Sequence, residues 1–228
     1  MIDLPWLDFE NPVFPPTKNA LEEPEGLLAA GGNLYVETLA EAYYRGIFPW
    51  YSDGEPPLWW SPNPRAILEP GDLIINRTTR KGINNSRFQF TSDQCCSRII
   101  NACAQTRPGE TWITEEMLEA YEQLHLAGHA HSLEVWENNK LAGGLYGVQV
   151  GAIFCGESMF HLSPNASKLA FICLAKNLFA QGFGMIDCQL QNPFLQSLGV
   201  KEVGRDLFEC RLSQLRDRRL PWPEEWNL

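Results

Sequence analysis

NASKLAFICLAKNLFAQGFGMIDCQ, residues 165–189, is the stretch of sequence that decides the fold. Its apolar residues recur at helical spacing from Asn165, a candidate N-cap, to Ala180, and Gly182 is a helix stop signal. The short apolar run 184–189 that follows is typical of a buried strand. With strands before it, a helix that crosses over to another strand indicates an α+β fold around one mixed sheet.

The sequence on the N-terminal side of this stretch predicts the remaining elements of that sheet. Thr114 is a plausible helix N-cap because two glutamates follow it in the first turn, and Gly128 ends that helix. Asn138-Asn139 is a turn signal within a meander of strands. The predicted strands are residues 65–68, 88–91, 132–137, 140–148 and 151–156, and the predicted helices are residues 96–104 and 114–127.

Residues 1–64 differ from the rest because they are rich in proline and aromatic residues, as in Phe48-Pro49-Trp50-Tyr51 and Trp59-Trp60-Ser61-Pro62-Asn63-Pro64. One helix is predicted inside them, at residues 36–45, and Gly46 is its stop signal. The surrounding glycines and prolines favour turns. We therefore predict a small N-terminal domain over residues 1–64 and a larger domain over residues 65–228.

The composition indicates a globular protein of the cytosol. The chain has 228 residues, of which 44% are hydrophobic, enough for a sizeable core. No apolar run reaches the ~18–20 residues that a membrane span requires. The acidic start Met1-Ile2-Asp3-Leu4-Pro5 lacks the basic residues of a signal peptide. A cytoplasmic location without membrane contact is expected.

Cysteine and histidine positions favour neither a disulfide framework nor a metal site. The seven cysteines are an odd number without a Cys-x-x-Cys pair. Five of them stand in apolar surroundings, where a core position is expected: Cys103, Cys155, Cys173, Cys188 and Cys210. His125, His129 and His131 lie close together, but no nearby Cys or acid completes a usual zinc ligand set.

The formal net charge of −10 argues against nonspecific coating of nucleic acid. The acids are concentrated in residues 1–60, where Lys18 and Arg45 are the only bases among ten acids. Four bases occur later in one stretch without an acid: Arg77, Arg80, Lys81 and Arg87. This stretch indicates either a local phosphate-binding face or an ordinary solvated surface.

Asp187 is the most informative acid because it stands in an otherwise apolar strand. A carboxylate in such a strand tends to be desolvated, which raises its pKa and suits a general base. Gln189 points to the same face of the strand and could orient a reacting group. A structural Asp that pairs with a loop explains the same pattern, and the residues alone do not decide between the two.

Glu157 ends the predicted strand 151–156, after Gly156, where a backbone or ligand can approach closely. If this strand neighbours that of Asp187, both acids face one cleft, which favours a cationic substrate. A solvent-facing strand end is the alternative. Ser158 follows in Gly-Glu-Ser-Met-Phe, which lacks the second glycine of a nucleophile elbow.

Four tryptophans give a further signal: Trp50, Trp59, Trp60 and Trp112. Exposed aromatic rings stack on nucleic-acid bases, which contributes ~1–3 kcal/mol per base. A single tryptophan is more often a core residue. Their density beside proline turns favours a binding role.

Taken together, the motifs closely resemble those of the bacterial leucyl/phenylalanyl-tRNA–protein transferase family, in the family's order and over nearly the whole chain. The matching segments are residues 26–34 (GLLAAGGNL), 44–50 (YRGIFPW), 59–65 (WWSPNPR), 111–114 (TWIT), 128–132 (GHAHS), 143–148 (GGLYGV), 154–160 (FCGESMF), 165–168 (NASK) and 186–189 (IDCQ).

The resemblance implies an enzyme that takes Leu, Phe or sometimes Met from aminoacyl-tRNA and attaches it to proteins that begin with Arg or Lys. The product is marked for degradation, and no metal or nucleotide cofactor is expected. It also implies a small N-terminal domain and a C-terminal domain similar to the Gcn5-type acetyltransferases. A monomer is expected.

The resemblance also implies roles for individual residues. Asp187 matches the base that acts with Gln189 on the attacking amine, and Glu157 matches an acid that lines the acceptor site. Trp50 and Trp112 match aromatics near the 3′-terminal adenosine. The stretch Arg77–Arg87 matches the tRNA-binding cluster, although it is less basic than usual for the family. The expected pocket for the transferred side chain comprises Leu145, Phe154, Met159, Leu169, Ile172, Cys173 and Ile186.

Two other functions fit parts of the sequence. An acetyltransferase that uses acetyl-CoA would need a glycine-rich pyrophosphate turn before the long helix, whereas residues 157–164 read ESMFHLSP. A non-catalytic module that binds a tRNA end or a peptide would explain the tryptophans. It would leave Asp187 beside Gln189 without an explanation.

Overall fold

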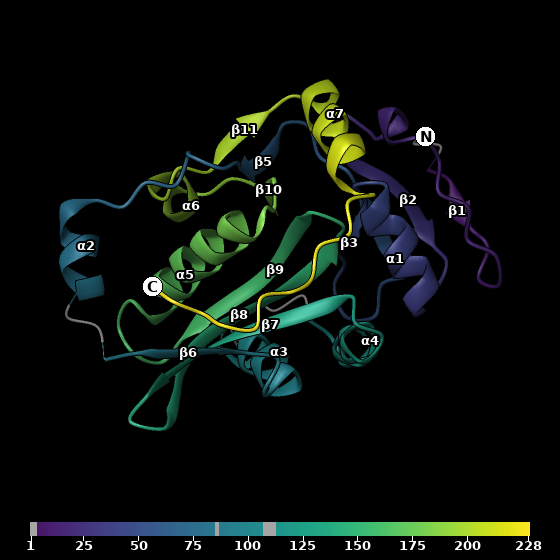
Figure 1. The fold of residues 1–228 in the computed structure, drawn as a ribbon. Coiled ribbons are helices and arrows are strands. Elements are labelled where there is room, and N and C mark those ends of the chain that lie inside the picture. The colour runs from purple at the N-terminus through teal and green to yellow at the C-terminus, as the bar shows by residue number, and fades with distance from the viewer. Residues whose placement is uncertain (1–3, 85–86, 107–112) are drawn as a thin grey trace.

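The computed structural model describes residues 4–84, 87–106 and 113–228. In this part of the chain the strands form two sheets (Figure 1). The smaller sheet has the order β1-β2-β4-β3, and the larger has the order β11-β5-β10-β9-β8-β7-β6. The strands of the smaller sheet precede residue 64 and those of the larger sheet follow it. The two sheets thus lie on either side of the predicted boundary, and their division into two domains stays a prediction.

The N-terminal part contains short strands and two helical segments. Its elements are β1 (Trp6–Leu7), the 3-10 helix η1 (Thr17–Asn19), β2 (Leu27–Gly31), α1 (Val36–Tyr44), β3 (Phe48–Pro49) and β4 (Leu58–Trp60). Helix α1 ends as predicted, since Gly46 has a φ of 77°, a conformation that glycine adopts without strain. The strands here were not predicted because runs of two to five residues are too short to show a periodicity.

The larger sheet and its helices follow. The strands are β5 (Arg65–Leu68), β6 (Gln89–Ser92), β7 (Ala130–Glu137), β8 (Lys140–Val150), β9 (Ile153–His161), β10 (Met185–Gln189) and β11 (Lys201–Val203). The helices are α2 (Arg77–Asn84), α3 (Cys96–Gln105), α4 (Glu115–Leu126), α5 (Ala166–Gln181), α6 (Pro193–Ser197) and α7 (Arg205–Leu215). Elements α2, α6, α7 and β11 were not predicted.

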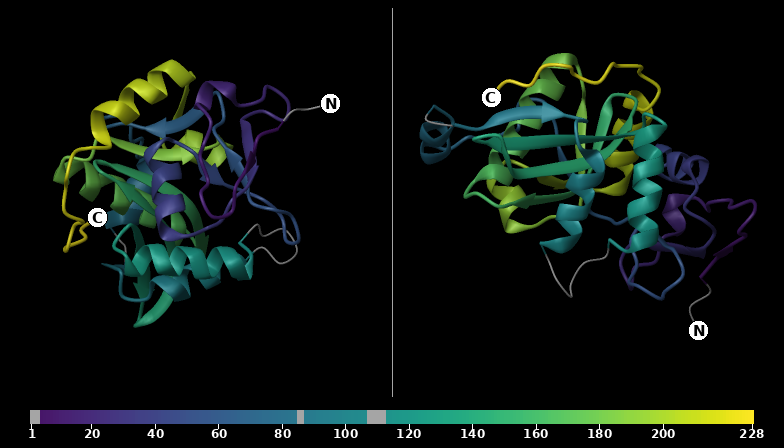
Figure 2. Two further views of the ribbon diagram at one scale, coloured as in Figure 1. Left: turned by 90° about the vertical axis from the view of Figure 1, so that its right-hand side faces the viewer. Right: turned by 90° about the horizontal axis from the view of Figure 1, so that it is seen from below.

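The predicted crossover is confirmed. Strands β9 and β10 pair in parallel through helix α5, whereas β10 pairs antiparallel with β5, so the sheet is mixed. Helix α5 covers one face of the sheet, and α3 and α4 cover the other (Figures 1 and 2). The apolar residues on the two faces form two core clusters, one of which also contains residues of α1 and α7.

Of three expectations on local structure, one is confirmed and two are wrong. Thr114 caps α4, since the Met117 amide donates to its hydroxyl at 3.2 Å. Asn165 precedes α5 but has a φ of 69° and makes no side-chain cap hydrogen bond, so it turns the chain instead. Cys210 is exposed, whereas Cys155 and Cys173 are buried as expected.

Irregular pairing occurs in both strands that carry the candidate acids. Tyr146 of β8 pairs with Ser158, and the next residue, Gly147, pairs with Gly156, so that Glu157 is an extra residue in β9. Strand β10 is irregular between Asp187 and Gln189 in its pairing with β5. An irregularity of this kind changes the direction in which a side chain leaves the strand.

No helix in the described residues is both long and apolar enough to cross a membrane.

Candidate active site

A cavity of ≈ 470 Å³ is lined by residues of β8, β9, β10, α5 and α6. Four of the side chains predicted for an aminoacyl pocket line it: Leu145, Phe154, Met159 and Ile186. Phe171 and Leu174 of α5 and Phe194 and Leu195 of α6 add to its apolar wall. Polar side chains, including Glu157 and Gln189, also line it. The cavity therefore combines an apolar surface with a carboxylate and an amide.

Three predicted pocket residues do not line this cavity. Leu169, Ile172 and Cys173 are buried in the core around α5 instead, and the α5 side of the cavity is formed by Ser167, Phe171 and Leu174. The reason for the error is that ten of the sixteen residues of α5 are buried. Helical periodicity identifies the face of a helix that is buried, but it does not tell which part of a wide buried face meets a cavity.

Glu157 and Gln189 are brought together because β9 and β10 are neighbouring strands, whereas the expectation from sequence was a cleft shared by Glu157 and Asp187. The Gln189 side-chain amide donates to Glu157 Oε1 at 3.2 Å. The other carboxylate oxygen of Glu157 accepts from the Tyr121 hydroxyl at 3.0 Å. Both oxygens of this acid are thus held by uncharged donors.

Burial raises the pKa of Glu157 to about 7. The hydrogen bonds from Tyr43 and Tyr121 lower it, and the negative charge of Asp187 raises it. The desolvation of the carboxylate outweighs the hydrogen bonds because, among the described residues, no cation forms an ion pair with it. Such a carboxyl group exchanges its proton near neutral pH, which is the range that suits acid–base catalysis.

Two buried tyrosines that the sequence analysis missed support Glu157 from behind. The Tyr121 hydroxyl of α4 is hydrogen-bonded to the Tyr43 hydroxyl of α1, and both side chains are buried. Burial raises the pKa of each phenol well above its usual value, so both stay protonated as donors. In the sequence Tyr43 counts only as part of the apolar face of its helix, and only the fold brings it to Glu157.

Asp187 forms a buried ion pair with Arg65, and each side chain is 1% exposed. Arg65 Nε donates to Asp187 Oδ1 at 2.8 Å and Nη2 donates to Oδ2 at 2.7 Å. The same guanidinium donates to the Gly46 carbonyl at 3.1 Å. Its carbon lies 4.9 Å and 4.6 Å from the ring centroids of Phe48 and Phe208, respectively. Each of the three guanidinium nitrogens therefore donates a hydrogen bond, and aromatic rings pack against the guanidinium group.

The position of Asp187 corrects the prediction that its carboxylate faces the cleft. It is not among the residues that line the cavity, and both its oxygens are bound to Arg65. Oδ1 also accepts from the Gln189 backbone amide at 3.0 Å. The sequence did not identify the partner because Arg65 lies 122 residues away. The local sequence shows only that Arg65 begins an otherwise apolar strand, and this pattern does not name its partner.

The tryptophans divide between surface and core. Trp50 is 42% exposed, and its ring centroid lies 5.5 Å from that of Trp60, so a stacking surface is available. Trp59 is fully buried and donates to the Gly31 carbonyl at 2.8 Å. Trp112 lies outside the described residues.

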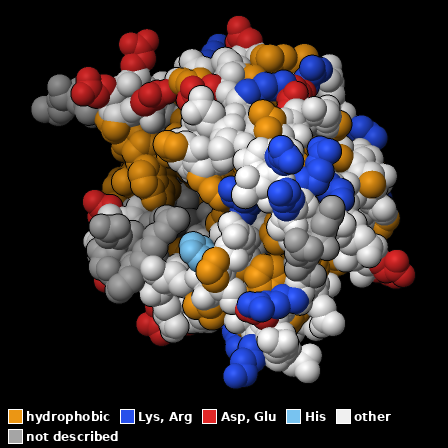
Figure 3. Space-filling model, turned by 90° about the vertical axis from the view of Figure 1, so that its left-hand side faces the viewer, with side chains coloured by type: hydrophobic (Ala, Val, Ile, Leu, Met, Phe, Trp, Pro, Cys, Tyr) orange, Lys and Arg blue, Asp and Glu red, His pale blue; other side chains and the backbone are white. Residues whose placement is uncertain are grey.

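The basic stretch forms an exposed helix and one ion pair. Arg77, Arg80 and Lys81 are exposed on α2, and Figure 3 shows Lys and Arg side chains gathered on the face that includes α2, beside a hollow with hydrophobic side chains. Arg87 forms an ion pair with Glu137. Three of the four bases are thus presented to solvent on one helix.

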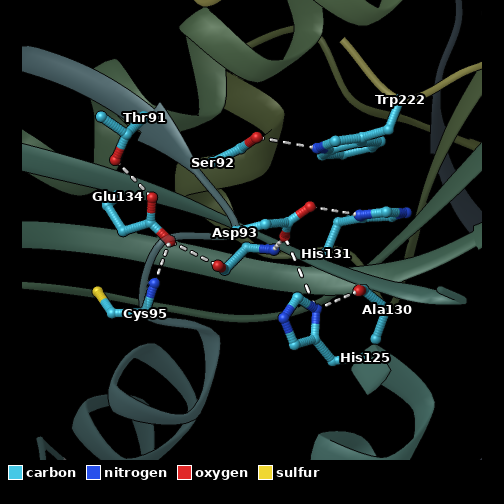
Figure 4. Close-up of polar contacts among 10 residues, drawn as sticks. Thr91, Ser92, Asp93, Cys95, His125, Ala130, His131, Glu134 and Trp222 are labelled. Carbon is cyan, nitrogen blue, oxygen red and sulfur yellow. Dashed lines mark hydrogen bonds and ion pairs between the residues drawn. The ribbon is translucent and has the colours of Figure 1, made fainter. Parts of the chain in front are cut away.

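Two of the three neighbouring histidines, His125 and His131, belong to a polar cluster at the end of β6 (Figure 4). His131 Nδ1 lies 2.7 Å from Asp93 Oδ2, and His125 Nδ1 lies 3.8 Å from Asp93 Oδ1. The ring of Trp222 stacks on His131 with centroids 4.2 Å apart. In the described part of the chain, no group of three or more His, Cys, Asp or Glu residues is placed to hold a metal ion.

Comparisons with family models and with individual relatives identify the same family. A model described as leucyl/phenylalanyl-tRNA protein transferase matches residues 67–213, and a model described as the N-terminal domain of the same transferase matches residues 32–63. A leucyl/phenylalanyl-tRNA–protein transferase from Photobacterium profundum is 50% identical over 94% of this chain and 91% of its own. The one from Pectobacterium carotovorum is 51% identical over 90% and 87%, respectively.

Solved structures show a weaker likeness. A GCN5-related N-acetyltransferase from Kribbella flavida has a TM-score of 0.40 and 10% identity, covering 75% of this chain and 60% of that one. The structure of L-PGS from Bacillus licheniformis has a TM-score of 0.42 and 10% identity, covering 72% and 53%. At these scores the α+β assignment rests on the sheet order described above.

The raised pKa of Glu157 predicts a pH-dependent stability. An unfolded Glu releases its proton near pH ~4.3, whereas folded Glu157 holds it to about 7. The folded state binds more protons in this window, so this group's contribution to stability falls as pH rises from ~4 to ~7, by about 3 kcal/mol. We expect Glu157→Gln to remove that fall, measured by urea unfolding between pH 5 and 8. Parallel dependences of unfolding free energy on pH for the variant and the wild type would contradict the assignment. Glu202→Gln, at an exposed position of β11, is the control.

The buried ion pair predicts a second stability effect. Asp187→Ala leaves the Arg65 charge buried without its partner, and we expect it to lower the free energy of unfolding by about 3–5 kcal/mol. The double variant Arg65→Met, Asp187→Leu removes both charges and should regain most of that loss. Urea unfolding at pH 7 measures both. A double variant no more stable than the single one would show that the pair itself, not the unpaired charge, is required.

Proposed function

Because the chain belongs to the leucyl/phenylalanyl-tRNA–protein transferase family, we propose that it transfers Leu or Phe, and in some cases Met, from aminoacyl-tRNA to a protein. The acceptor is the N-terminal α-amine of a protein that begins with Arg or Lys, and the product is marked for degradation. The observation that carries the proposal is the cavity, in which an apolar wall adjoins Glu157 and Gln189.

The chemistry requires little of the enzyme beyond positioning and proton transfer. An aminoacyl ester is already activated, so amide formation is downhill. The enzyme has to hold the ester beside the amine, remove a proton from the nitrogen and stabilise the tetrahedral oxyanion. The paired side chains of Glu157 and Gln189 provide a carboxylate and an amide donor at one point of the cavity wall.

The apolar wall suits the side chain of the transferred amino acid. Burial of Leu or Phe against Phe154, Phe171 and Leu174 contributes ~25 cal/mol per Å² of apolar area. A pocket of this kind separates similar apolar side chains by only ~1–3 kcal/mol per methylene. Overlapping use of Leu, Phe and Met follows from these magnitudes.

The remaining surfaces suit the other parts of the two substrates. Glu157 supplies negative charge at the cavity for a cationic acceptor. Exposed Arg77, Arg80 and Lys81 supply positive charge for the tRNA phosphates. Trp50 offers an exposed ring for the terminal adenosine, and the same role of Trp112 stays a prediction. The proposed reaction needs no metal or nucleotide cofactor and takes place in the cytoplasm.

Neither alternative function accounts for the site as well. The segment that precedes α5 continues as strand β9 to His161 and contains no glycine after Gly156, whereas pyrophosphate binding by acetyl-CoA enzymes uses a glycine-rich turn at this point. A module that only binds a tRNA end would leave the paired Glu157 and Gln189 unexplained.

A transfer assay tests the proposed function. The purified protein is mixed with labelled Leu-tRNA or Phe-tRNA and with peptides that start with Arg, Lys or Ala. We expect label in the Arg and Lys peptides because their side chains are cationic, and much less in the Ala peptide. The matched control is the Arg peptide with an acetylated N-terminus, which has no free amine and should stay unlabelled. Failure of both donors with every free-amine peptide would refute the proposal.

Two neighbouring residues of α5 test the side-chain pocket. Phe171 lines the cavity, whereas Ile172 is fully buried in the core. We expect Phe171→Ala to change the ratio of kcat/KM for Phe-tRNA to that for Leu-tRNA by about 10-fold or more, in favour of Phe, because the cavity is enlarged. Ile172→Ala should lower stability and leave the ratio unchanged. The opposite pattern would place the pocket on the other face of α5.

A further inference from the structure

The site holds two carboxylates in contrasting states. Glu157 lines the cavity and accepts hydrogen bonds from Gln189 and Tyr121, which are both uncharged. Asp187 lies behind it, 1% exposed, and its two oxygens are bound by the guanidinium of Arg65. Glu157 is therefore accessible to a substrate amine in the cavity. The charge of Asp187 is balanced by the positive charge of Arg65.

We propose that Glu157 takes up the proton that the attacking α-amine loses, and that Arg65 and Asp187 are positioning residues that act through Gln189. This inference rests on the proposed function, because it assigns roles within that same transfer reaction. It differs from the expectation that Asp187 is the base.

The positioning role follows from a continuous set of contacts. Asp187 Oδ1 accepts from both Arg65 Nε and the Gln189 backbone amide, at 2.8 and 3.0 Å. Gln189 has a φ of 57°, a left-handed conformation that is uncommon for a residue other than glycine and needs support from its surroundings. In that conformation its side chain donates to Glu157 Oε1. The ion pair therefore fixes the backbone that aims the amide at the carboxylate.

The proton transfer balances without a co-reactant. The neutral amine attacks the ester carbonyl carbon, a carbon–nitrogen bond forms, and the nitrogen becomes positively charged. Glu157 accepts one proton from this nitrogen. The bond between the carbonyl carbon and the ribose oxygen then breaks, and Glu157 returns the proton to that oxygen. The products are the amide and the free hydroxyl of the tRNA, and the carboxylate is regenerated.

The groups around Glu157 keep it suited to both steps. Tyrosine hydroxyls contribute from α1, α4 and β8, and charged groups contribute from β5 and β10. These groups are Tyr43, Tyr121, Tyr146, Arg65 and Asp187. The resulting pKa of about 7 supports the role, because the group both gains and gives a proton near neutral pH. The phenols remain protonated there, since burial raises the pKa of each well above its usual value.

The test compares single-turnover transfer rates at saturating aminoacyl-tRNA for the full-length variants Glu157→Gln, Asp187→Asn and Arg65→Lys. We expect Glu157→Gln to lower the rate by about 10²–10⁴-fold and to remove the rise of rate with pH that belongs to this carboxylate. Deprotonation of the acceptor amine also raises the transfer rate with pH, and this second rise should occur in all variants. Asp187→Asn should keep the carboxylate's rise and move it to lower pH, because the charge of Asp187 raises the pKa of Glu157.

Arg65→Lys keeps the charge but loses the two-point contact with Asp187. We expect a lower maximal rate with little change in KM for the peptide. The carboxylate's rise should move to higher pH, because the Gln189 hydrogen bond that favours the charged form of Glu157 weakens. A merely structural role would lower the folded fraction in thermal unfolding without moving this rise.

Chemical rescue separates the two acids further. Glu157→Ala leaves space in the cavity for a small carboxylate, and we expect added formate to restore part of its activity. Asp187→Ala should gain nothing from formate. Rescue of the Asp187 variant alone, or a Glu157→Gln transfer rate within about threefold of the wild-type rate, would overturn the proposal.

Glu202→Gln, at an exposed position, serves as the charge-matched control. Absence of transfer by the wild type would instead refute the proposed function itself.

Discussion

The rest of the site depends on the buried ion pair between Arg65 and Asp187. Taking two charges out of water costs several kcal/mol for each ion, which is offset only when the geometry is good and the remaining donors are satisfied. Here the guanidinium meets both carboxylate oxygens, the Gly46 carbonyl, and the rings of Phe48 and Phe208. These partners come from the N-terminal part, from β10 and from α7. The pair thus holds three separate regions of the chain at one point.

The irregular pairing of β9 and β10 explains how the side chains reach one cavity. These strands are parallel and run together as far as the register pair Asp187 and Cys155. Just beyond this point each strand departs from regular pairing, at Glu157 in one and before Gln189 in the other. Regular strands would alternate their side chains between two faces. The irregularities release both residues from that alternation, so the carboxylate and the amide meet at the same edge.

The sequence predicted the crossover of α5 because the crossover depends on local patterns. The helical spacing up to Ala180 and the apolar run after Gly182 are visible without a partner. The predicted end of a strand before Glu157 was wrong, because β9 continues to His161. The burial of Asp187 against Arg65 was not predictable, since no local pattern records a contact between such distant residues. The face of α5 at the cavity was missed for a different reason. The apolar spacing of α5 identifies a helix, but most of its residues are buried, so the spacing does not mark the face that meets the cavity.

The distribution of charge resolves the apparent conflict between a net charge of −10 and the proposed tRNA donor. The ten acids of residues 1–60 belong to the part that carries the small sheet, whereas α2 follows β5 in the part built on the large sheet. A polyanion is repelled by the first region and attracted by the exposed bases of α2. Long-range repulsion of this kind lowers affinity but favours one orientation. For the proposed tRNA donor, the acidic region therefore disfavours approach to the small sheet, and the exposed bases of α2 favour the orientation that brings the phosphates to α2.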